Sequence, residues 1–544
     1  MFLLLVSGAQ SQRTPFDARE ATIGSIHHSL FSGLNSCQDV VSSFLARIEK
    51  LNFHVNAIIT LDKNALCEAV ILDEQLGIGN ATQSLFCIPI LLKDNYDTAD
   101  MPTTGGNLAL AQSQPLIDAP SVSALRRAGA IVLGKTNLHE LALEGLSVSS
   151  LGAQTVNPYD STRTPGGSSG GSGAAIAASF AVFATGTDTV NSLRSPASAN
   201  SLFSIRPTRG LISRTGVIPI SYKQDALGPI ARTIEDVAAA LTVMADVGFD
   251  PSDNTTALIP PSSVGVNYLA SLRAFPLETL RLGLITTFFN RTAGSETTPV
   301  SSAMDNMVMR LRAAGVTVVP ITSSIYNSSA ILAVYDTQRY EYQESMDAYL
   351  SQPSLGGSHP SSLKELYAAN SSKGGGKFLV IPSQYEYVTT SLASSPANST
   401  YSTVQCGIRN LTLALQETFR QNDLDALIYP EQINLVVKIG WPSQSGRNGI
   451  LAAVTGSPVV TIPVGFSNAT TSALVGVPIG MELLGQPWSE QKLLNIARAI
   501  EMLGTVRIAP RWANEIVEVG NMTRVPVLYP NTGNIPKQYP VGVL

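Results

Sequence analysis

The sequence predicts a protein of the α/β class. Apolar runs of strand length alternate with amphipathic helical segments along most of the chain, and a strand–helix–strand unit stands out near its middle. The 544 residues can bury a large core, in one domain or two, and 44% of them are hydrophobic while 14% are charged. This composition is typical of a globular protein and excludes a disordered one.

The charge balance excludes two classes of partner. The net charge of −5 provides no positive field for nucleic acid or for an anionic membrane, and no Lys/Arg cluster supplies one locally. The longest apolar stretches, such as 174–184, are too short to cross a bilayer. We therefore expect no nucleic-acid partner and no membrane span.

The first elements lead to a lysine at a strand end. Residues 17–52 predict two helices, 56–60 a strand and 64–76 a helix. Residues 87–95 form a buried apolar strand that stops at Lys93, where a functional group at the end of a core strand would stand. A lysine that merely snorkels from the strand end is the alternative. A helix ending near Ala128, a strand at 130–137 and a helix opened by His139 follow.

The stretch from Pro165 to Arg209 carries the strongest signal. A Gly/Ser turn holds Ser168 and Ser169, an Ala-rich apolar segment follows, and a second polar turn presents Ser192. Most Gly/Ser runs are flexible linkers, but a linker has no reason to continue directly into a small-residue helix. Two serine-bearing turns around one buried segment can converge, which indicates a hydroxyl nucleophile.

The second half predicts further α/β elements. A helix starts within 228–236 with Thr233 as its cap. A strand at 280–286, a helix at 302–314 and a strand at 316–321 make a β-α-β crossover. Strands at 424–430, 456–464 and 476–484 precede a helix at 490–502. The stretch 323–401 between them is rich in Ser, Gly and Tyr.

Several motifs resemble the amidase signature family. They are GGSSGG, then GTD, then S-x-R-x-P-A at matching spacing, together with the I-P-x-x-x-K-D strand and the GKTN-x-x-E segment. The resemblance spans about residues 17–505 and is weakest in the middle. It implies one large domain over 13–544, whose mixed β-sheet core is covered on both faces by helices. The core would be 17–320 and 402–505, and about 323–401 a variable helical cap that shapes the substrate funnel.

The resemblance also implies an amidase that cleaves the C–N bond of a linear carboxamide through an acyl-enzyme. Ser192 would attack, and Ser168, on a cis peptide after Gly167, would relay the proton to a neutral Lys93. The oxyanion hole would be the backbone N–H groups of Thr189, Val190, Asn191 and Ser192. Family members need no cofactor or metal. We expect a small-molecule amide as the partner, with a homodimer left open.

Neighbouring polar residues are assigned structural roles. On a strand, Asp94 should face away from Lys93 and so need not hold it charged. His139 is interpreted as packing or capping, and Glu140 as the structural glutamate of the family's segment.

Two rival readings remain. Residues 166–170 also satisfy G-x-S-x-G, the nucleophile elbow of α/β-hydrolases, but only His359 lies downstream to serve it. The other rival is an amidase-fold protein that binds without hydrolysing or performs a different acyl transfer, because Val190-Asn191 replaces the usual Gly-Gly. Asn191 tolerates a positive φ while Val190 must stay in the β region, so their side chains would narrow the approach to the site.

Other features suggest export. Residues 1–12 are interpreted as a signal-peptide remnant or merely as an apolar segment. N-x-S/T sequons, in excess but partly expected by chance, begin at Asn80, Asn254, Asn290, Asn327, Asn370, Asn398, Asn410, Asn468 and Asn521. The cysteines are Cys37, Cys67, Cys87 and Cys406, without metal-site spacing. Cys67 and Cys87 could bridge in an exported protein, and buried free thiols are the alternative.

Overall fold

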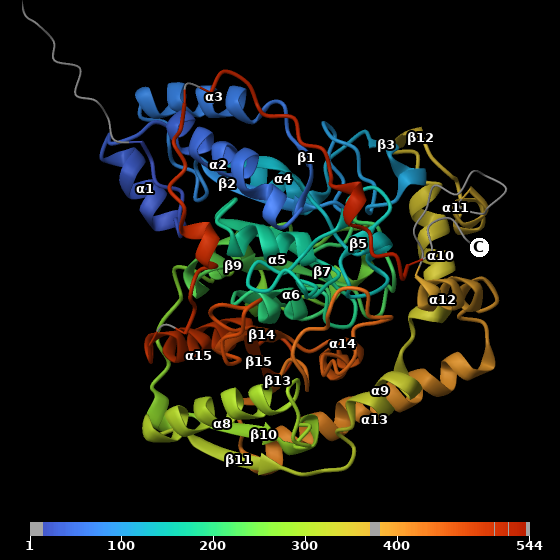
Figure 1. Ribbon diagram of the computed structural model, residues 1–544. Coiled ribbons are helices and arrows are strands. Elements are labelled where there is room, and N and C mark those ends of the chain that lie inside the picture. Colours follow the sequence, from blue (N-terminus) through green and yellow to red (C-terminus); the bar gives the residue numbers. More distant parts are fainter. Residues whose placement is uncertain (1–14, 370–380, 505, 521, 540–544) are drawn as a thin grey trace, which may run out of the picture.

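One long twisted sheet organises the molecule (Figure 1). The structure, a computed structural model, describes residues 15–369, 381–504, 506–520 and 522–539. Within these residues the main sheet has eleven strands. In spatial order they are β1 (Ile58–Leu61), β4 (Ala130–Thr136), β2 (Ile88–Lys93), β7 (Phe183–Asp188), β9 (Ala226–Ala231), β8 (Phe203–Arg206), β14 (Val459–Phe466), β15 (Pro478–Leu484), β13 (Ala426–Pro430), β10 (Arg281–Ile285) and β11 (Thr317–Ile321).

Helices pack on the sheet from two sides, which confirms the expected mixed α/β fold. One set, which includes α5 and α6, contacts β7, β8 and β15, while another set that includes α7, α8 and α15 contacts β9 and β14. The helices that surround the sheet are α1 (Ile23–Phe31), α2 (Cys37–Leu51), α3 (Ala65–Gly77), α4 (Pro120–Arg127), α5 (Gly170–Ala177), α6 (Arg194–Ala199), α7 (Ile234–Ala245), α8 (Thr298–Ala313), α14 (Ile450–Thr455) and α15 (Glu490–Met502).

The strand directions create a junction at β2. This strand runs parallel to β4 on one side and to β7 on the other, whereas β9, β8, β14 and β15 are antiparallel to their neighbours. The chain passes from β2 to β4 on one side and later from β4 across β2 to β7 on the other, so the direction of the connections reverses here and the carboxyl ends of β2 and β7 lie side by side. Such a reversal is where open α/β sheets place ligands. Lys93 and Asp188 are the last residues of these two strands.

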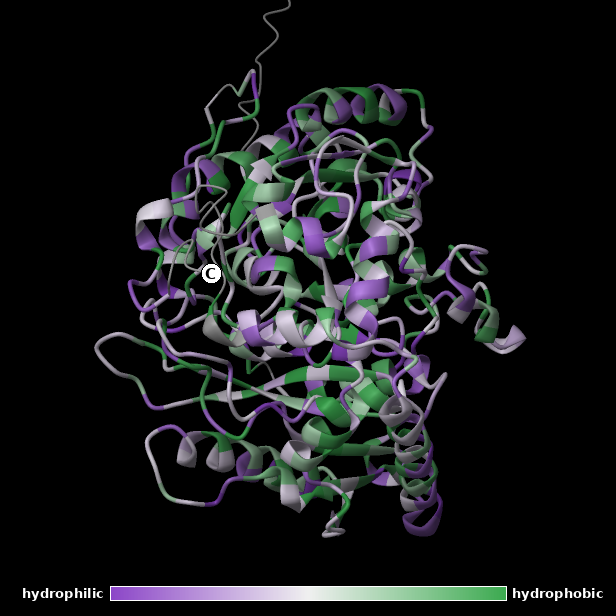
Figure 2. Ribbon diagram, turned by 90° about the vertical axis from the view of Figure 1, so that its right-hand side faces the viewer, coloured by the Kyte–Doolittle hydropathy of each residue, from purple (hydrophilic) through white to green (hydrophobic). Residues whose placement is uncertain are grey.

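The centre of the sheet is apolar and closely packed. All residues of β2, β4 and β7 are buried, as expected for strands covered on both faces, and Figure 2 shows the sheet as largely green. Helix α5 approaches the strands at Gly171, where a Cβ would lie 2.2 Å from the carbonyl oxygen of Asn137. The small residues of the signature stretch thus allow backbone to pack against backbone.

Most elements occur where the sequence pattern predicts them. Helix α15 has the expected bounds, the β10–α8–β11 crossover is parallel, and Thr233 caps α7 by accepting a hydrogen bond from Asp236 N (3.1 Å). Strand β9 just before that cap is not predicted. Gly228 of β9 lies directly against the backbone of β8, because a Cβ added to it would be only 2.1 Å from the carbonyl oxygen of Ile205. This glycine therefore marks close packing within the sheet and not the end of a strand. His139 precedes only a short turn, Glu140–Ala142, instead of a helix.

The stretch expected as a cap holds helices beside one end of the sheet. We call α9 to α13 the cap helices, and with the small sheet β3–β12 their bounds are α9 (Ser328–Tyr335), α10 (Gln338–Leu350), α11 (Leu363–Ala369), α12 (Pro382–Leu392), α13 (Ser399–Asn422), β3 (Gln112–Pro115) and β12 (Leu355–Ser358). Thr337 N donates to Gln224 Oε1 (2.7 Å), and Tyr349 OH donates to Asp97 Oδ1 (2.7 Å). Residues 370–380, within the expected cap, lie outside the described residues.

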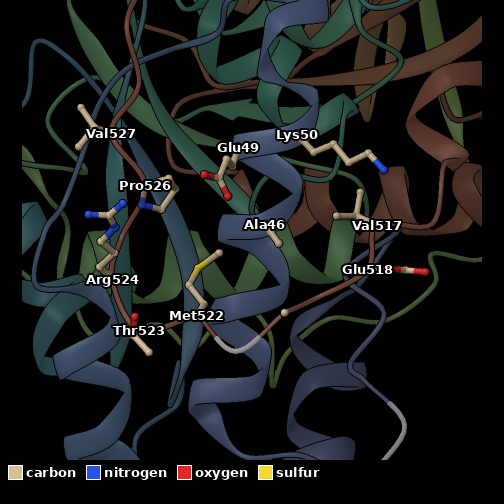
Figure 3. A pocket seen from close by; sticks show the side chains of 11 residues that line it. Ala46, Glu49, Lys50, Val517, Glu518, Met522, Thr523, Arg524, Pro526 and Val527 are labelled. Atoms are coloured by element: carbon tan, nitrogen blue, oxygen red, sulfur yellow. The ribbon is translucent and has the colours of Figure 1, made fainter.

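Residues 513–520 and 522–527 cross the face of α2. The buried guanidinium of Arg47 donates to the carbonyl oxygens of Ala513 (2.8 Å) and Glu515 (3.0 Å), besides those of Ala178 and Ser179. A hollow of about 620 Å³ opens between this segment and α2, and Glu49, Lys50, Val517, Met522 and Arg524 are among the residues that line it (Figure 3). None of the predicted site residues lines it. Among the described helices, none is long and apolar enough to span a membrane.

The predicted disulfide between Cys67 and Cys87 is wrong, because Cys87 has a different partner. Cys87 pairs with Cys37, because the N-terminus of α2 packs on the start of β2 and brings the two Cα atoms to 5.7 Å. Cys67 lies on the outer face of α3, whose inner face is formed by Ala65, Leu66 and Ala69. Cys67 and Cys406 are free but exposed, so the alternative of buried thiols is wrong as well.

Candidate active site

Lys93 ends β2 in complete burial. Its Nζ hydrogen-bonds with Ser168 Oγ (2.8 Å) and Thr187 Oγ1 (2.7 Å), and no carboxylate of the described chain lies within ion-pair distance of it. Burial lowers the pKa of Lys93 to about 7, although the more distant charges of Asp188 and Asp225 oppose the shift. A lysine in this state can accept a proton near neutral pH.

Ser168 and its neighbours come from the turn that starts α5. The Gly167–Ser168 peptide is cis, and the carbonyl oxygen of Ser168 accepts a hydrogen bond from His139 N (3.0 Å). Ser169 N donates to the carbonyl oxygen of Ser192 (3.2 Å), so the two serine turns lie side by side. The structure thus brings Lys93, Ser168 and the turn of Ser192 together at one end of the sheet.

The loop after β7 carries Ser192, and we call residues 189–192 the oxyanion loop. Ser192 is 7% exposed, while Lys93 and Ser168 are wholly buried. In the described part of the chain, no acceptor pairs with the backbone N–H groups of Thr189, Val190, Asn191 or Ser192. Consecutive free N–H groups beside a serine are what a developing oxyanion requires.

A network of buried ion pairs around Arg194 holds the oxyanion loop in place. Arg194 donates to both oxygens of Glu482 (2.9 and 2.8 Å) and to Asp188 (3.0 and 3.1 Å). Asp188 also accepts from Arg206 (3.0 Å) and from Leu193 N (3.1 Å). Burial alone would raise the pKa of Asp188, but the two guanidinium groups hold it below its usual value. Since Arg194 Nη2 also contacts the carbonyl oxygens of Val190 and Gly449, the network determines the path of the loop.

Val190 and Asn191 do not project together into the site. Val190 packs into an apolar cluster with residues of α14 and β13. Asn191 Nδ2 donates to Glu431 Oε1 (2.7 Å), and Asn191 is not among the residues with positive φ, so the glycine-like conformation considered for it is wrong. The loop keeps its N–H groups free with an ordinary backbone, because the buried side chain of Asn191 turns toward β13.

The other predicted residues have structural contacts. Asp94 accepts from Thr104 Oγ1 and lies 3.7 Å from Lys135, away from Lys93 as expected. His139 contacts Gln384 Oε1 through Nε2 (2.9 Å), and burial lowers its pKa to about 4. Glu140 accepts from Ser150 N (3.0 Å).

His359 does not serve the rival nucleophile elbow. Both of its ring nitrogens lie against the carbonyl oxygens of Leu355 (3.3 Å) and Pro360 (2.8 Å), and it makes no hydrogen bond to Ser168 or Ser169 among the described residues.

One acidic cluster has the spacing of a metal site. Ligand oxygens of Asp62, Glu68 and Asp100 lie within 4.8 Å of one another. The guanidinium of Arg126 already lies among them, 2.9 Å from Glu68 and 2.6 Å from Asp100. A guanidinium of the protein itself therefore pairs with the carboxylates that a metal ion would use.

Sequence reasoning missed two groups at the site. Thr187 accepts a hydrogen bond from Lys93 Nζ. It is the second residue of the GTD motif, and a polar residue within an apolar strand is a sequence signal that indicates a functional side chain. Glu431 reaches Asn191 from 240 positions away. Its only local signal is its place directly after an apolar strand, the same signal that singled out Lys93.

Comparison with known proteins agrees with this geometry. Residues 39–494 match the amidase family. The chain is 32% identical to a subunit of the glutamyl-tRNA(Gln) amidotransferase of Alkaliphilus metalliredigens, over 90% of this chain and 98% of that protein. It is 31% identical to an Arabidopsis thaliana protein named "Probable amidase", over 94% and 96% of the two chains. Peptide amidase from Stenotrophomonas maltophilia has a similar structure, with a TM-score of 0.80, 33% identity, and coverage of 91% of this chain and 99% of that one. These matches span nearly the whole chain, so the protein is an enzyme of the amidase signature family.

Proposed function

We propose that this enzyme hydrolyses the C–N bond of a linear carboxamide through an acyl-enzyme on Ser192. The observation that carries the proposal is the buried hydrogen bond between Lys93 Nζ and Ser168 Oγ (2.8 Å), beside the oxyanion loop. A buried amine whose pKa lies at about 7 is a base at neutral pH, and an unactivated serine needs such a base.

The steps follow from this arrangement. Ser192 Oγ attacks the amide carbon while its proton passes to Ser168 Oγ, whose own proton passes to Lys93 Nζ. The tetrahedral oxyanion accepts hydrogen bonds from N–H groups of the oxyanion loop, each donor worth roughly 3 kcal/mol. The C–N bond then breaks as the leaving nitrogen takes a proton back through Ser168. Water attacks the acyl group by the same route in reverse and releases the carboxylic acid.

Covalent labelling with a serine-reactive fluorophosphonate, followed by peptide mapping, tests the proposal. We expect the label on Ser192, and Ser192→Ala should abolish both labelling and turnover. Ser121→Ala is a matched control, since this serine is buried on α4 with its Oγ unbonded among the described residues. Labelling of Ser168 or Ser169 instead would overturn the assignment. A folded wild type that takes no label would favour binding without hydrolysis, the alternative that Val190-Asn191 suggests.

We also propose that the protein is exported and N-glycosylated. Seven sequon asparagines lie in the described residues, and all but the half-buried Asn290 are exposed. The Cys37–Cys87 disulfide supports an oxidising compartment. Protein from a eukaryotic secretory host should shift in gel mobility after treatment with an N-glycosidase. An unchanged mobility would contradict the proposal. The expected signal remnant at 1–12 lies outside the described residues.

A further inference from the structure

Asn191, in the oxyanion loop, and Glu431, outside it, form a buried polar pair. Asn191 Nδ2 donates to Glu431 Oε1 (2.7 Å), and both residues are fully buried. Glu431 directly follows β13, so the pair joins a strand end to the residue before the nucleophile. Gly449 leaves room for it, since a Cβ there would lie 2.5 Å from Asn191 Cβ.

Each residue of the pair has one side-chain oxygen that accepts no hydrogen bond in the described chain. Asn191 Oδ1 and Glu431 Oε2 are both buried and both lack a hydrogen bond in the described chain. Leaving a buried acceptor unpaired costs about 1–3 kcal/mol. A single proton on Oε2 would satisfy both oxygens, because a neutral carboxyl group can accept from the amide N–H and donate its O–H to the amide oxygen.

The charges around Glu431 favour this protonated form. Burial first and then the charge of Glu482, on β15, raise the pKa of Glu431 to about 8. Arg194 on α6 opposes the shift but is already paired with Glu482 and Asp188. Arg447 opposes it too and lies 3.6 Å from Glu144, while Tyr429 contributes only its neutral phenol, its own pKa being raised by burial.

We propose that Glu431 is a positioning residue that acts as a neutral acid, bound to Asn191 by two hydrogen bonds, and that its ionisation disables the oxyanion loop. This inference rests on the proposed function of the loop. Ionisation would remove one of the two hydrogen bonds and place a negative charge behind N–H groups that must receive a second negative charge. Two like charges in a buried site oppose each other strongly.

The consequence is a narrow pH optimum. The rate should rise as Lys93 loses its proton through about pH 7 and fall as Glu431 loses its own through about pH 8. One unit above its pKa, a group retains its proton in roughly a tenth of the molecules, so the rate at pH 9 should be about tenfold below that of a protein with a neutral side chain at 431.

The test is the rate of fluorophosphonate labelling of Ser192 between pH 6 and pH 10. Glu431→Gln reproduces both hydrogen bonds, because a carboxamide accepts and donates without a proton to lose. This variant should label like the wild type at pH 7, within about threefold, and keep its rate at pH 9. Glu490→Gln is the matched control: Glu490 is also buried with a raised pKa, but it binds Thr208 N (2.7 Å). The labelling rate of Glu490→Gln should decrease between pH 7 and pH 9 as it does in the wild type.

Two results would overturn the inference while the proposed function stands. One is an alkaline fall that persists in Glu431→Gln, and the other is a wild type that labels on Ser192 without an alkaline fall. Infrared spectroscopy provides a readout without activity. In the difference spectrum between the wild type and Glu431→Gln, the carbonyl band of a protonated carboxyl group should be present at pH 7 and fall to roughly a tenth by pH 9. If Ser192 takes no label while this band is present, the proposed function fails and the protonated pair remains. A wild type without the band contradicts the pair.

Asn191→Ala is the second variant, should Glu431→Gln not fold. It removes both hydrogen bonds to Glu431 but keeps the Cβ beside Gly449. The labelling rate at pH 7 should fall roughly tenfold, the cost of about 1.4 kcal/mol in the transition state. The alkaline limb should also change its position, because Glu431 then loses its proton without either hydrogen bond to the amide group of Asn191. An unchanged rate and profile would overturn the inference.

Discussion

Lys93 and Arg194 are both fully buried cations within the same site, and their surroundings are opposite. Lys93, at the end of β2, meets only the hydroxyl groups of Ser168 and Thr187. Arg194, at the start of α6, meets the carboxylates of Asp188 and Glu482. Burial lowers the pKa of Lys93 to about 7, whereas the two carboxylates raise that of Arg194 in spite of its burial.

The difference separates the proposed proton-transfer group, Lys93, from a scaffold residue, Arg194. A base must be able to lose its charge, so the β2 end omits a carboxylate partner. A loop that must present fixed N–H groups gains from permanent charges in bidentate pairs, which specify one geometry. Burial of Lys93 without a carboxylate destabilises the fold, whereas the ion pairs of Arg194 constrain it. Variants of Lys93 and of Arg194 should therefore change the free energy of unfolding in opposite directions.

Lys93→Met should have the largest effect on activity, and an opposite effect on stability. Turnover and labelling should fall by roughly 10³-fold or more, since general-base catalysis is lost. The folded pKa of Lys93 is lowered from 10.5 to about 7, so the folded state binds fewer protons between these values and stability rises with pH there. The cost of burying the charge is complete below about pH 7.

Replacing Lys93 should therefore raise the free energy of unfolding most at pH 6 and less at pH 9. Urea unfolding at the two pH values measures this, with the exposed Lys63→Met as a control. A gain that does not vary with pH would contradict a depressed pKa for Lys93.

Arg194→Met should instead destabilise the fold. It leaves two buried carboxylates without their shared partner, which typically costs 3–5 kcal/mol. The control is Arg498→Met, which breaks pairs with Glu235 and Glu501 on a partly exposed side chain and should cost less than about 1 kcal/mol. Chemical denaturation measures both. Equal losses in the two variants would mean that the network around Arg194 adds nothing special.

Gly449→Ala tests how tightly the scaffold holds the loop. The new Cβ would lie 2.5 Å from Asn191 Cβ and 2.7 Å from the carbonyl oxygen of Val190, so the loop must shift. We expect a loss of about 1–3 kcal/mol and slower labelling of Ser192. Gly77→Ala, with nothing within 4 Å at the end of α3, should be neutral or stabilise slightly. A labelling rate in Gly449→Ala that equals the wild-type rate would show that the loop tolerates displacement.

Thr187→Val should have the smallest effect and act on the base alone. Valine removes an oxygen that accepts from the charged amine of Lys93, which favours the neutral form. The acid limb of the pH–labelling profile should move below about pH 7, with a maximal rate reduced by less than about tenfold. Thr461→Val, a buried threonine of β14 whose Oγ1 has no partner in the described chain, is the control. An acid limb that stays in place would remove Thr187 from the control of this pKa.

The sequence was informative wherever chemistry follows a regular strand. The apolar run that ends in a charge marks Lys93 as a candidate, the resemblance to the amidase signature family assigns its role, and strand alternation predicts the direction of Asp94. Contacts made across the fold were not predictable from such local patterns. The partner of Cys87 is 50 positions away on α2 rather than on the nearer α3, and helix packing decides between the two.

The Val190-Asn191 substitution shows the same limit. From the sequence it was read as an obstruction of the site, because two side chains replace two glycines. The structure places Asn191 against Glu431, which no local pattern connects to it. The effect of the replacement on the loop thus depends on a residue of a different strand.

Arg47 ties the order of synthesis to the completion of the first helical layer. Two of its four carbonyl partners, at Ala513 and Glu515, lie 466 and 468 positions further along the chain. While α2 is leaving the ribosome these carbonyls do not yet exist, so its guanidinium must keep part of its hydration. The segment that crosses α2 supplies these two carbonyl oxygens, in place of water, only after α2 itself has been made. The four carbonyl acceptors of Arg47 are therefore complete only after residues 513–515 have been made.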